Sequence, residues 1–315
     1  MRQYVYDLSI LIVSWNTSDL LADCLHSIYA HTPNLSFEVI VVDNASSDGT
    51  ADMIRSVFPH VVLVENEQNV GFGMASNQGF QLAVGKYVGI LNPDTVLLNR
   101  AFVILVSHLE SMLQVGIIGP KIEGANGTTQ QTCARGYITL WSDFLQASGL
   151  RSKLKGQNNS ASNAHLAMRQ VDCISGACFV VRRNAVQSAQ LFDPRFFMYG
   201  EDVDLCYRVK SNGWKIFYCP EARVLHYGGA SSALNPETPL FGARSNNLYI
   251  AIHYGSVAGW LDKVMWFSVS AGKFIVSLSA LLILPQSRHR KWVYRRNLYM
   301  QLMKWALNPA VVARR

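Results

Sequence analysis

The sequence lacks several features that would assign it to other classes of protein. Its cysteines show none of the paired spacing that binds zinc. They occur at positions 24, 133, 173, 178, 206 and 219. The first 17 residues contain Asp7 and lead directly into strand-like sequence, without the basic, apolar and small-residue zones of a signal peptide. We therefore expect reduced, mostly buried thiols in a cytosolic protein.

Acidic residues are absent from the C-terminal end of the chain. The last one is Asp262, and ten Lys and Arg residues follow it. The first 262 residues have 18 basic and 21 acidic residues, a formal charge of −3, although the whole chain carries +7. This distribution argues against a nucleic-acid-binding core. It predicts a tail that prefers an anionic membrane surface, a nucleic acid or an acidic partner.

Apolar runs alternate with helical patterns along the first 92 residues. With 315 residues, 50% of them hydrophobic, the chain can bury a large core. Four apolar runs suit buried strands, and segments with helical spacing separate them. The runs span residues 8–16, 37–44, 61–66 and 86–92. This order predicts an α/β fold with a mostly parallel sheet and helices on both faces.

The chain after residue 92 is less regular. Residues 99–114 are expected to form another helix and residues 115–122 another strand. Residues 124–170 are rich in Gly, Asn, Ser, Thr and Gln, which is typical of a lid or an insertion rather than of packed structure. Ligands of parallel sheets bind beyond the carboxyl ends of the strands. The residues that end the predicted strands are therefore the candidates for a binding site.

Asp43 ends the second predicted strand, within the stretch VVDNASSDGT. Capping of the next helix explains the polar residues 46–48 without any ligand. It does not explain a carboxylate at the end of a buried strand, facing the ligand crevice. Such a carboxylate can accept a hydrogen bond from the imide N–H of uracil or thymine. The stretch therefore predicts a contact between Asp43 and a nucleotide base.

The stretch NVGFGMASNQG contains only part of a dinucleotide-binding fingerprint. Gly71 and Gly73 would need a third glycine at position 76, where the chain has Ser76. The pattern still suggests a backbone that comes close to a ligand, with Asn77 one helical turn further on. A helix start whose small residues serve packing is the alternative.

Three carboxylates follow a Tyr-Gly break in the first turn of a predicted helix. They are Glu201, Asp202 and Asp204. The helix dipole favours acidic residues there without any further function, but three exceed what capping needs. His226 ends another strand, and joined to the carboxylate of Asp94 it would complete an oxygen and nitrogen metal site.

The stretch LNPDT ends the fourth predicted strand, and by itself it is explained by a tight turn. Taken with the other motifs, it resembles part of a family 2 glycosyltransferase of the GT-A fold. The motifs, in order, are SILIVSWN, VVDNASSDGT, NVGFGMASNQG, LNPDT, SGACFVVRR, YGEDVDLCYR and HYGG. The similarity is strongest to the rhamnosyltransferase-like branch, which assembles bacterial surface polysaccharides, and it covers residues 8–230.

The resemblance implies a nucleotide-sugar site that uses Mg²⁺ or Mn²⁺. Asn92-Pro93-Asp94 stands where the fold has its Asp-x-Asp metal motif. Asp94 then supplies the charged ligand, and His226 gains importance as a second protein ligand. Asp43 should hold the base. The other residues implied in the nucleotide crevice are Ser14, Asn16, Asn44, Gly71, Asn77 and Asn92.

The resemblance also implies an acceptor side. Ser175, Gly176 and Ala177 should form the floor of the acceptor site. Asp202 aligns with the general base that deprotonates the acceptor hydroxyl, so that the sugar is displaced with inversion. Its neighbour Glu201 is expected to raise its proton affinity by like-charge repulsion.

The expected substrates and domains follow the same resemblance. The donor is expected to be dTDP-L-rhamnose or a related dTDP- or UDP-sugar, and the acceptor a saccharide or a lipid-linked saccharide. Residues 1–235 would form the catalytic domain, with a nucleotide-binding half (1–120) and an acceptor half (121–235). Residues 236–315 would form a helical, basic region.

The tail leaves two interpretations open. Residues 264–285 are long enough to span a bilayer, but Lys273 near their centre disfavours an integral span. The basic segment 288–296 follows, with Trp292 and Tyr294 interleaved, a composition suited to lipid headgroups. We expect peripheral binding to the cytoplasmic face of the cell membrane. A helical hairpin that packs on the catalytic domain or forms a homo-oligomer is the alternative.

Two other functions compete with the transferase. A nucleotidyltransferase that makes the sugar nucleotide would need a basic, glycine-rich phosphate loop after the first strand, and SWNTSDLL has no basic residue. A catalytically inactive homologue could scaffold a membrane assembly through its tail. The presence of both Asp94 and Asp202 speaks against that second possibility.

Overall fold

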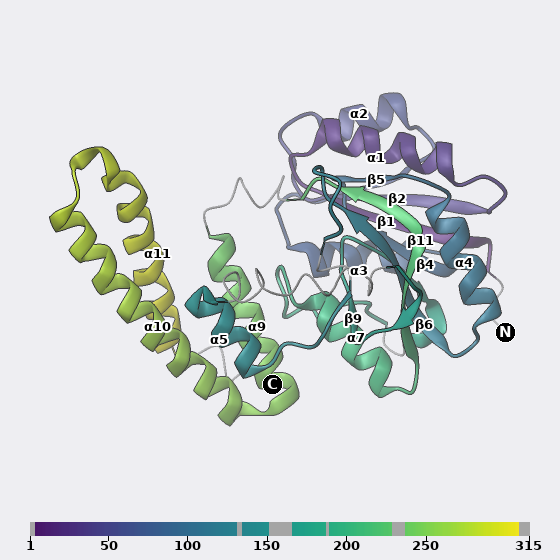
Figure 1. The fold of residues 1–315 in the computed structure, drawn as a ribbon. Coiled ribbons are helices and arrows are strands. Elements are labelled where there is room, and N and C mark those ends of the chain that lie inside the picture. Colours follow the sequence, from purple (N-terminus) through teal and green to yellow (C-terminus); the bar gives the residue numbers. More distant parts are fainter. Residues whose placement is uncertain (1–3, 131–133, 151–165, 187–188, 229–236, 309–315) are drawn as a thin grey trace. The chain divides into compact units, whose positions relative to one another are not determined.

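The computed structural model describes residues 4–130, 134–150, 166–186, 189–228 and 237–308 (Figure 1). The chain divides into two compact units. The first comprises residues 1–137 and 161–234, and the second comprises residues 138–160 and 235–315. The expected division into domains at residue 235 stays a prediction.

The first unit begins with strands and helices in alternation. The elements are β1 (Tyr6–Ser14), α1 (Ser18–His31), β2 (Phe37–Asp43), α2 (Thr50–Val57), β3 (Val62–Glu65), α3 (Phe72–Leu82) and β4 (Gly85–Leu91). All residues of β1 from Leu8 to Ser14 are buried, as expected for a strand that is covered on both faces. The first four predicted strands are therefore confirmed.

Seven more strands, two more α-helices and a 3-10 helix follow in the described part of the first unit. They are β5 (Thr95–Leu97), α4 (Ala101–Ser111), β6 (Val115–Glu123), β7 (Ala134–Arg135), β8 (Arg169–Gln170), β9 (Cys173–Ile174), β10 (Cys178–Arg182), the 3-10 helix η3 (Arg183–Ala185), α7 (Glu201–Ser211) and β11 (Lys215–His226). The five cysteines among the described residues are free and buried, as the sequence predicts. Cys133 lies outside the described residues.

Nine of the described strands form one sheet, in the order β3-β2-β1-β4-β10-β6-β11-β5, with β8 paired to β11. Neighbours from β3 to β4 are parallel, as are β6 and β11. β10 runs antiparallel between β4 and β6. Helices cover both faces, with α1 and α2 on one side and α3 and α7 on the other (Figure 1). The predicted α/β fold is confirmed.

This topology places the carboxyl ends of four strands, β1, β2, β4 and β11, at one edge of the sheet. β1, β2 and β4 are parallel. β6 and β11 run in the same direction as β4, because both β4 and β6 are antiparallel to β10. The carboxyl ends at Ser14, Asp43, Leu91 and His226 therefore point the same way, toward the edge where ligands of such sheets bind.

The described part of the second unit is helical. It consists of α5 (Leu140–Ser148), α9 (Thr238–Tyr254), α10 (Ser256–Ile283), the 3-10 helix η4 (Gln286–Arg288) and α11 (His289–Leu307). A shared core holds Ala147, Leu240, Ala243, Trp266, Leu302 and Trp305. A capping box of Thr139 and Ser142 starts α5. The expectation that residues 124–170 are irregular is thus wrong for this helix, which contributes Ala147 to the shared core.

A buried polar network joins the helices of the second unit. Asp143 of α5 accepts hydrogen bonds from the indole N–H of Trp266, at 2.6 Å, and from the amide of Asn246. Asp262 accepts one from Asn247 at 2.9 Å. Burial, together with the charge of Asp143, raises the pKa of Asp262 to about 8. The carboxyl of Asp262 is therefore held protonated at neutral pH.

One described helix, α10, is long and apolar enough to cross a membrane by length and composition. Only 17% of its apolar stretch is buried, and the rest is partly or fully exposed. Lys273 donates to the carbonyl oxygen of Ala147 at 2.5 Å, and its ammonium lies over the ring of Tyr299. The charge near the centre of the stretch is thus compensated within the unit.

Candidate active site

The loops after β1 and β2 are joined by hydrogen bonds at the carboxyl edge of the sheet. Asn16 adopts a positive φ of 52°, a conformation that Asn tolerates better than most residues. Its backbone N–H donates to Ser46 Oγ at 2.9 Å, and its side-chain oxygen accepts from the N–H of Ser47 at 2.8 Å. Ser14 is buried and shares a hydrogen bond with Thr17. The two residues thus shape the wall of the predicted nucleotide crevice.

Asp43 is buried at the end of β2 and holds the loop that follows it. Its carboxylate accepts hydrogen bonds from the backbone N–H of Ser46, at 3.2 Å, and from the hydroxyl of Ser46. Asp48, in the same loop, accepts hydrogen bonds from the backbone N–H of Thr50 and from that of Ser18 at the start of α1. Capping therefore accounts for Asp48. Asp43 retains acceptor capacity beyond Ser46, because a carboxylate can accept about four hydrogen bonds.

Asn44 uses its whole side-chain amide inside the protein. The nitrogen donates to Asn69 at 2.9 Å and to the carbonyl of Gly71 at 3.5 Å. The oxygen accepts from Asn66 at 3.1 Å and from the N–H of Val70 at 3.0 Å. Two donors and two lone pairs are all that an amide offers. Asn44 is therefore positioned to hold the 66–71 loop rather than to present its own amide to a ligand.

Gly71 and Asn77 contact a segment more than a hundred residues away. A Cβ at Gly71 would lie 2.5 Å from the carbonyl oxygen of Phe197, which accepts from the N–H of Phe72 at 2.8 Å. The amide of Asn77 pairs with both backbone groups of Phe192, at 2.8 and 2.9 Å. The close backbone approach that the glycine pattern suggests is thus made to the protein itself. Roles for Gly71 and Asn77 in nucleotide binding stay predictions.

Asp94 and His226 lie together, as the sequence predicts. Nε2 of His226 is 3.2 Å from Oδ1 of Asp94 and 3.4 Å from the amide nitrogen of Asn92. Gln130 donates to the backbone carbonyl of His226 at 2.9 Å, so its side-chain oxygen faces Nδ1 of the same ring at 3.1 Å. This oxygen can only accept. Nδ1 therefore carries a proton, and Nε2 is the ring atom that faces Asp94.

The donor set fits a divalent cation. With Nδ1 protonated, a neutral His226 ring presents the lone pair of Nε2 to Oδ1 of Asp94, 3.2 Å away. Both atoms are hydrogen-bond acceptors, so a proton or a metal ion is needed between them. Neighbouring ligands of an octahedral ion lie about 3 Å apart when each is about 2.1 Å from the metal. A ring N–H bonded to an amide oxygen is also the usual outer-shell arrangement of a ligating His. Asp94 and His226 are thus the residues that could hold Mg²⁺ or Mn²⁺.

The loop between β9 and β10 connects this corner to the acidic helix start. The carbonyl of Ala177 accepts from the N–H of Asn92 at 2.9 Å. The N–H of Gly176 donates to Oδ2 of Asp202 at 2.9 Å. Ser175 Oγ accepts from the N–H of Ala177 at 3.3 Å. The 175–177 loop, the predicted acceptor floor, therefore contacts both Asn92, beside the Asp94–His226 pair, and the predicted base Asp202.

Asp202 is held by four hydrogen bonds at the start of α7. One nitrogen of the Arg135 guanidinium lies 2.9 Å from both of its oxygens. The backbone N–H of Val203 donates to Oδ1 at 2.8 Å, and that of Gly176 to Oδ2. The sequence motif provides only like charges beside Asp202, whereas the structure adds a cation from β7. Arg135 was not predicted, although it is the only Lys or Arg between residues 124 and 150.

Glu201 is buried next to Asp202 and differs from it. One oxygen of Glu201 has no hydrogen-bond partner among the described residues. Burial, reinforced by the charge of Asp202, raises the pKa of Glu201 to about 8. The chain reaches this helix start through Tyr199, whose φ is 68°, and Gly200, whose φ is 81°. Positive φ at two consecutive residues marks a tight turn directly before the two carboxylates.

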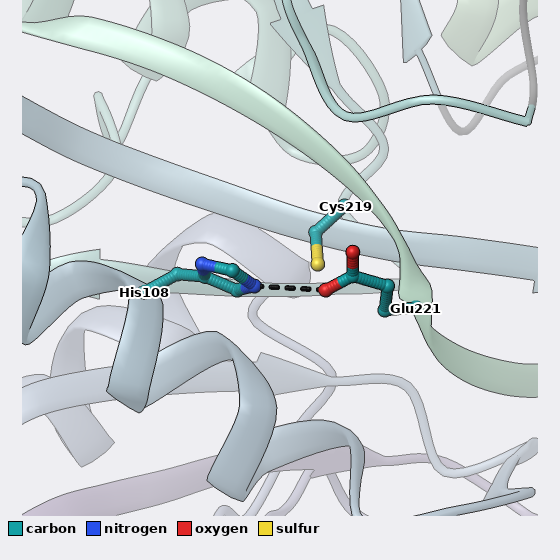
Figure 2. A group of neighbouring side chains, drawn as sticks. All are labelled: His108, Cys219 and Glu221. Carbon is teal, nitrogen blue, oxygen red and sulfur yellow. Dashed lines mark hydrogen bonds and ion pairs between the residues drawn. The ribbon is translucent and has the colours of Figure 1, made fainter.

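A second group of potential metal ligands lies elsewhere in the unit. Figure 2 shows His108 of α4 beside Cys219 and Glu221 of β11, with the three ligand atoms within 4.8 Å of one another. Nε2 of His108 lies 3.0 Å from Oε2 of Glu221. Burial raises the pKa of the Cys219 thiol and keeps it protonated. The group joins α4 to β11 through the hydrogen bond between His108 and Glu221, and this role needs no metal.

Comparison with known proteins assigns the family. The model of the family described as "Glycosyltransferase like family 2" matches residues 6–247. An N-acetylglucosaminyl-diphospho-decaprenol L-rhamnosyltransferase from Mycobacterium tuberculosis is 27% identical over 271 residues, covering 80% of this chain and 86% of the relative. The rhamnosyltransferase WbbL from Escherichia coli is 24% identical, covering 69% of this chain and 82% of the relative.

A solved structure with a similar fold is that of a mannosyltransferase from Pyrobaculum calidifontis in complex with GDP-Man and Mn²⁺. It has a TM-score of 0.54 and 15% sequence identity, covering 98% of this chain and 89% of that protein. The family match sets aside the nucleotidyltransferase alternative. The chain belongs to glycosyltransferase family 2, and it is a glycosyltransferase of the GT-A fold.

Proposed function

We propose that the protein transfers L-rhamnose from dTDP-L-rhamnose to a lipid-linked saccharide, with inversion, in the synthesis of a cell-surface polysaccharide. One observation carries the proposal. The 175–177 loop hydrogen-bonds both Asn92 and Asp202, which supports a cation site and a base that act on one substrate. The names of the two relatives support the choice of sugar, and the name of the mycobacterial relative supports an acceptor with a diphosphate-linked lipid.

On the donor side, Asp94 and His226 would hold the divalent cation. When bound, Mg²⁺ or Mn²⁺ would neutralise the negative charge that develops on the nucleotide diphosphate. Asp43 would accept the imide N–H of the base. Asn44 would support the nucleotide site indirectly, because it holds the 66–71 loop in place. Asn16 and Ser14 would shape the neighbouring wall of the nucleotide crevice.

On the acceptor side, Asp202 would accept the proton of the acceptor hydroxyl. The hydroxyl oxygen attacks the anomeric carbon from the face opposite to the diphosphate, which leaves with the electrons of the broken bond. Inversion follows from this single displacement. Ser175, Gly176 and Ala177 would form the floor on which the acceptor sugar rests.

The second unit would bind the cytoplasmic membrane surface peripherally. Apolar side chains of α10 are strongly exposed, with Leu282 at 87% and Ile283 at 80%, and the basic start of α11 follows. Flotation with anionic liposomes tests this role. The full chain should float at low salt and be released by high salt. If it stays in the soluble fraction at low salt, the exposed helix serves packing between chains instead.

A donor panel tests the enzymatic proposal. The purified protein with Mn²⁺ should show a larger thermal shift with dTDP-L-rhamnose than with UDP-glucose, because a ligand of the native state raises stability by mass action. It should also transfer rhamnose to N-acetylglucosamine linked through a diphosphate to a short lipid. Equal stabilisation by the two donors would refute the choice of dTDP-L-rhamnose.

A further inference from the structure

A cationic pocket lies beside the predicted base. It has a volume of about 390 Å³, and its charged lining residues are Arg135, Arg169, Asp172 and Lys210. Three cations and one carboxylate give the lining a formal charge of +2. The pocket lies within the first unit, between β7, β8 and α7. A pocket of this charge favours an anionic ligand.

Arg135 belongs both to this pocket and to the hydrogen bonds of Asp202. One of its terminal nitrogens contacts both oxygens of Asp202 at 2.9 Å. Its side chain is 30% exposed, whereas that of Asp202 is 9% exposed. The Nε–H of Arg135 is buried and has no hydrogen-bond partner among the described residues. The guanidinium therefore has donor capacity that Asp202 does not use.

Lys210, another cation of the pocket, is held by an exchangeable ion pair. Lys210 pairs with Asp172 at 2.6 Å, and the two side chains are 35% and 45% exposed. Arg169 stacks over the ring of Tyr218 at 5.8 Å. Exposed ion pairs contribute little to stability, so Lys210 can turn toward a ligand at small cost. Asp202, in contrast, accepts four hydrogen bonds and has no lone pair left for a substrate proton.

We propose that this pocket binds the phosphate of the acceptor, and that the bound anion draws Arg135 away from Asp202 and so frees the base. The inference rests on the proposed role of Asp202. Phosphate is the fitting anion, because the planar guanidinium forms paired hydrogen bonds with its oxygens. The acceptor class is therefore a saccharide phosphate or diphosphate, as in a lipid-linked sugar.

The coupling has a chemical purpose. After Arg135 moves to the phosphate, Asp202 accepts the proton of the acceptor hydroxyl, the oxygen–carbon bond forms, and the nucleotide diphosphate leaves with the electrons of the broken bond. No oxidant or further reactant is needed. Without an acceptor, Arg135 occupies the base and suppresses transfer of the sugar to water. The pocket thus ties base activation to the presence of the correct acceptor.

The first experiment compares two acceptors that share a sugar, one an alkyl diphosphate and the other an uncharged alkyl glycoside. Arg169→Gln and Lys210→Gln should each raise the KM of the diphosphate acceptor about tenfold relative to that of the glycoside, the loss expected for one charge-assisted hydrogen bond. Lys86→Gln, which removes a surface cation paired with Glu110, is the matched control. Unchanged KM ratios in both pocket variants would overturn the pocket assignment.

The second experiment measures hydrolysis of the donor without acceptor. Arg135→Gln should increase hydrolysis about tenfold, because a freed base contributes at least that much to proton transfer. Arg135→Lys keeps the positive charge and should increase it less. If Arg135 only stabilises the fold, hydrolysis and transfer will fall together and the melting temperature will drop. That outcome, or unchanged hydrolysis in a stable Arg135→Gln protein, would overturn the coupling.

Failure of the inference can be separated from failure of the proposed function. Asp202→Asn in the Arg135→Gln background should abolish the extra hydrolysis. If Asp202→Asn alone leaves transfer intact, the base assignment itself is wrong. If Asp202→Asn abolishes transfer but Arg135→Gln leaves donor hydrolysis unchanged, only the coupling through the pocket is wrong.

Discussion

Two carboxylates of the candidate active site are buried to the same extent, but their charges are compensated differently. The side chains of Asp94 and Asp202 are each 9% exposed. Asp202 has a cation of the protein, Arg135, on both of its oxygens. Asp94 has the ring of His226, which is neutral unless it takes up a second proton. Burial of a charge requires compensation. The protein itself supplies the cation for Asp202, whereas Asp94 would need an exchangeable metal ion.

Replacement of Asp202 should have the largest effect on turnover. Asp202→Asn removes the proton acceptor but keeps the shape of the side chain, so transfer should fall by roughly 10²–10⁴-fold. Donor binding, measured by calorimetry with Mn²⁺, should stay close to that of the wild type, because the base acts on the acceptor. An equal loss of donor affinity and turnover would place Asp202 in the cation site and remove the contrast with Asp94.

Replacement of Asp94 should act on the donor instead. Asp94→Ala should weaken donor binding roughly 100-fold in the presence of Mn²⁺, because even outer-shell changes at metal sites cost 10–100-fold. In EDTA, wild type and variant should bind the donor equally weakly. Full activity of the wild type in EDTA would contradict an exchangeable cation at Asp94.

Gln130 tests whether the orientation of His226 matters. Gln130→Leu removes the acceptor for the Nδ1 proton and the bond to the His226 carbonyl. The concentration of Mn²⁺ that gives half-maximal activity should rise about tenfold, while turnover at saturating Mn²⁺ changes less. Gln78→Leu, at another amide pair of the same unit, serves as the control. An unchanged Mn²⁺ requirement would show that the bond to Gln130 is not needed for metal binding.

Glu201 should make stability depend on pH. Its pKa is about 8 in the folded protein and about 4.3 when unfolded. Between these values the unfolded state binds fewer protons than the folded state, so stability falls as pH rises through this window and the loss is complete above pH 8. Glu201→Gln removes this loss. Its melting temperature relative to the wild type should rise by about 3 °C or more from pH 5 to pH 8.5.

The control for this measurement is an exposed carboxylate. Asp52→Asn, at a side chain that is 88% exposed, should leave the difference in melting temperature constant over the same range. Asp262 also has a pKa of about 8, but it is present in both proteins and cancels in the comparison. A pH-independent difference for Glu201→Gln would mean that Glu201 is ionised in the folded protein at neutral pH.

The strand ends could be predicted from the sequence because their signal is local. A continuous apolar run followed by polar residues identified Ser14, Asp43 and Asn92 as neighbours at one edge. The sequence placed Asp94 and His226 in one metal site, and the two side chains lie 3.2 Å apart, although metal binding stays a prediction. The antiparallel insertion of β10 between β4 and β6 was not predicted, because strand order depends on contacts between distant segments.

The partners of the site residues could not be predicted for the same reason. Asn77 and Gly71 carry a local pattern typical of ligand loops, yet they contact Phe192 and Phe197. Arg135 reaches Asp202 across 67 residues, from a stretch whose composition resembles a loop. Only the fold shows that the cation on the predicted base comes from that stretch.

The bond between Asn77 and Phe192 has a consequence during synthesis. The two residues are 115 positions apart, and a ribosome adding about 5–20 residues per second needs roughly 6–23 s to cover that distance. During this time the buried amide of Asn77 and the glycine turn at Gly71 have no partner. The part of the sheet that contains β1 to β4 therefore emerges with an open flank, which only the arrival of residues 192–197 closes.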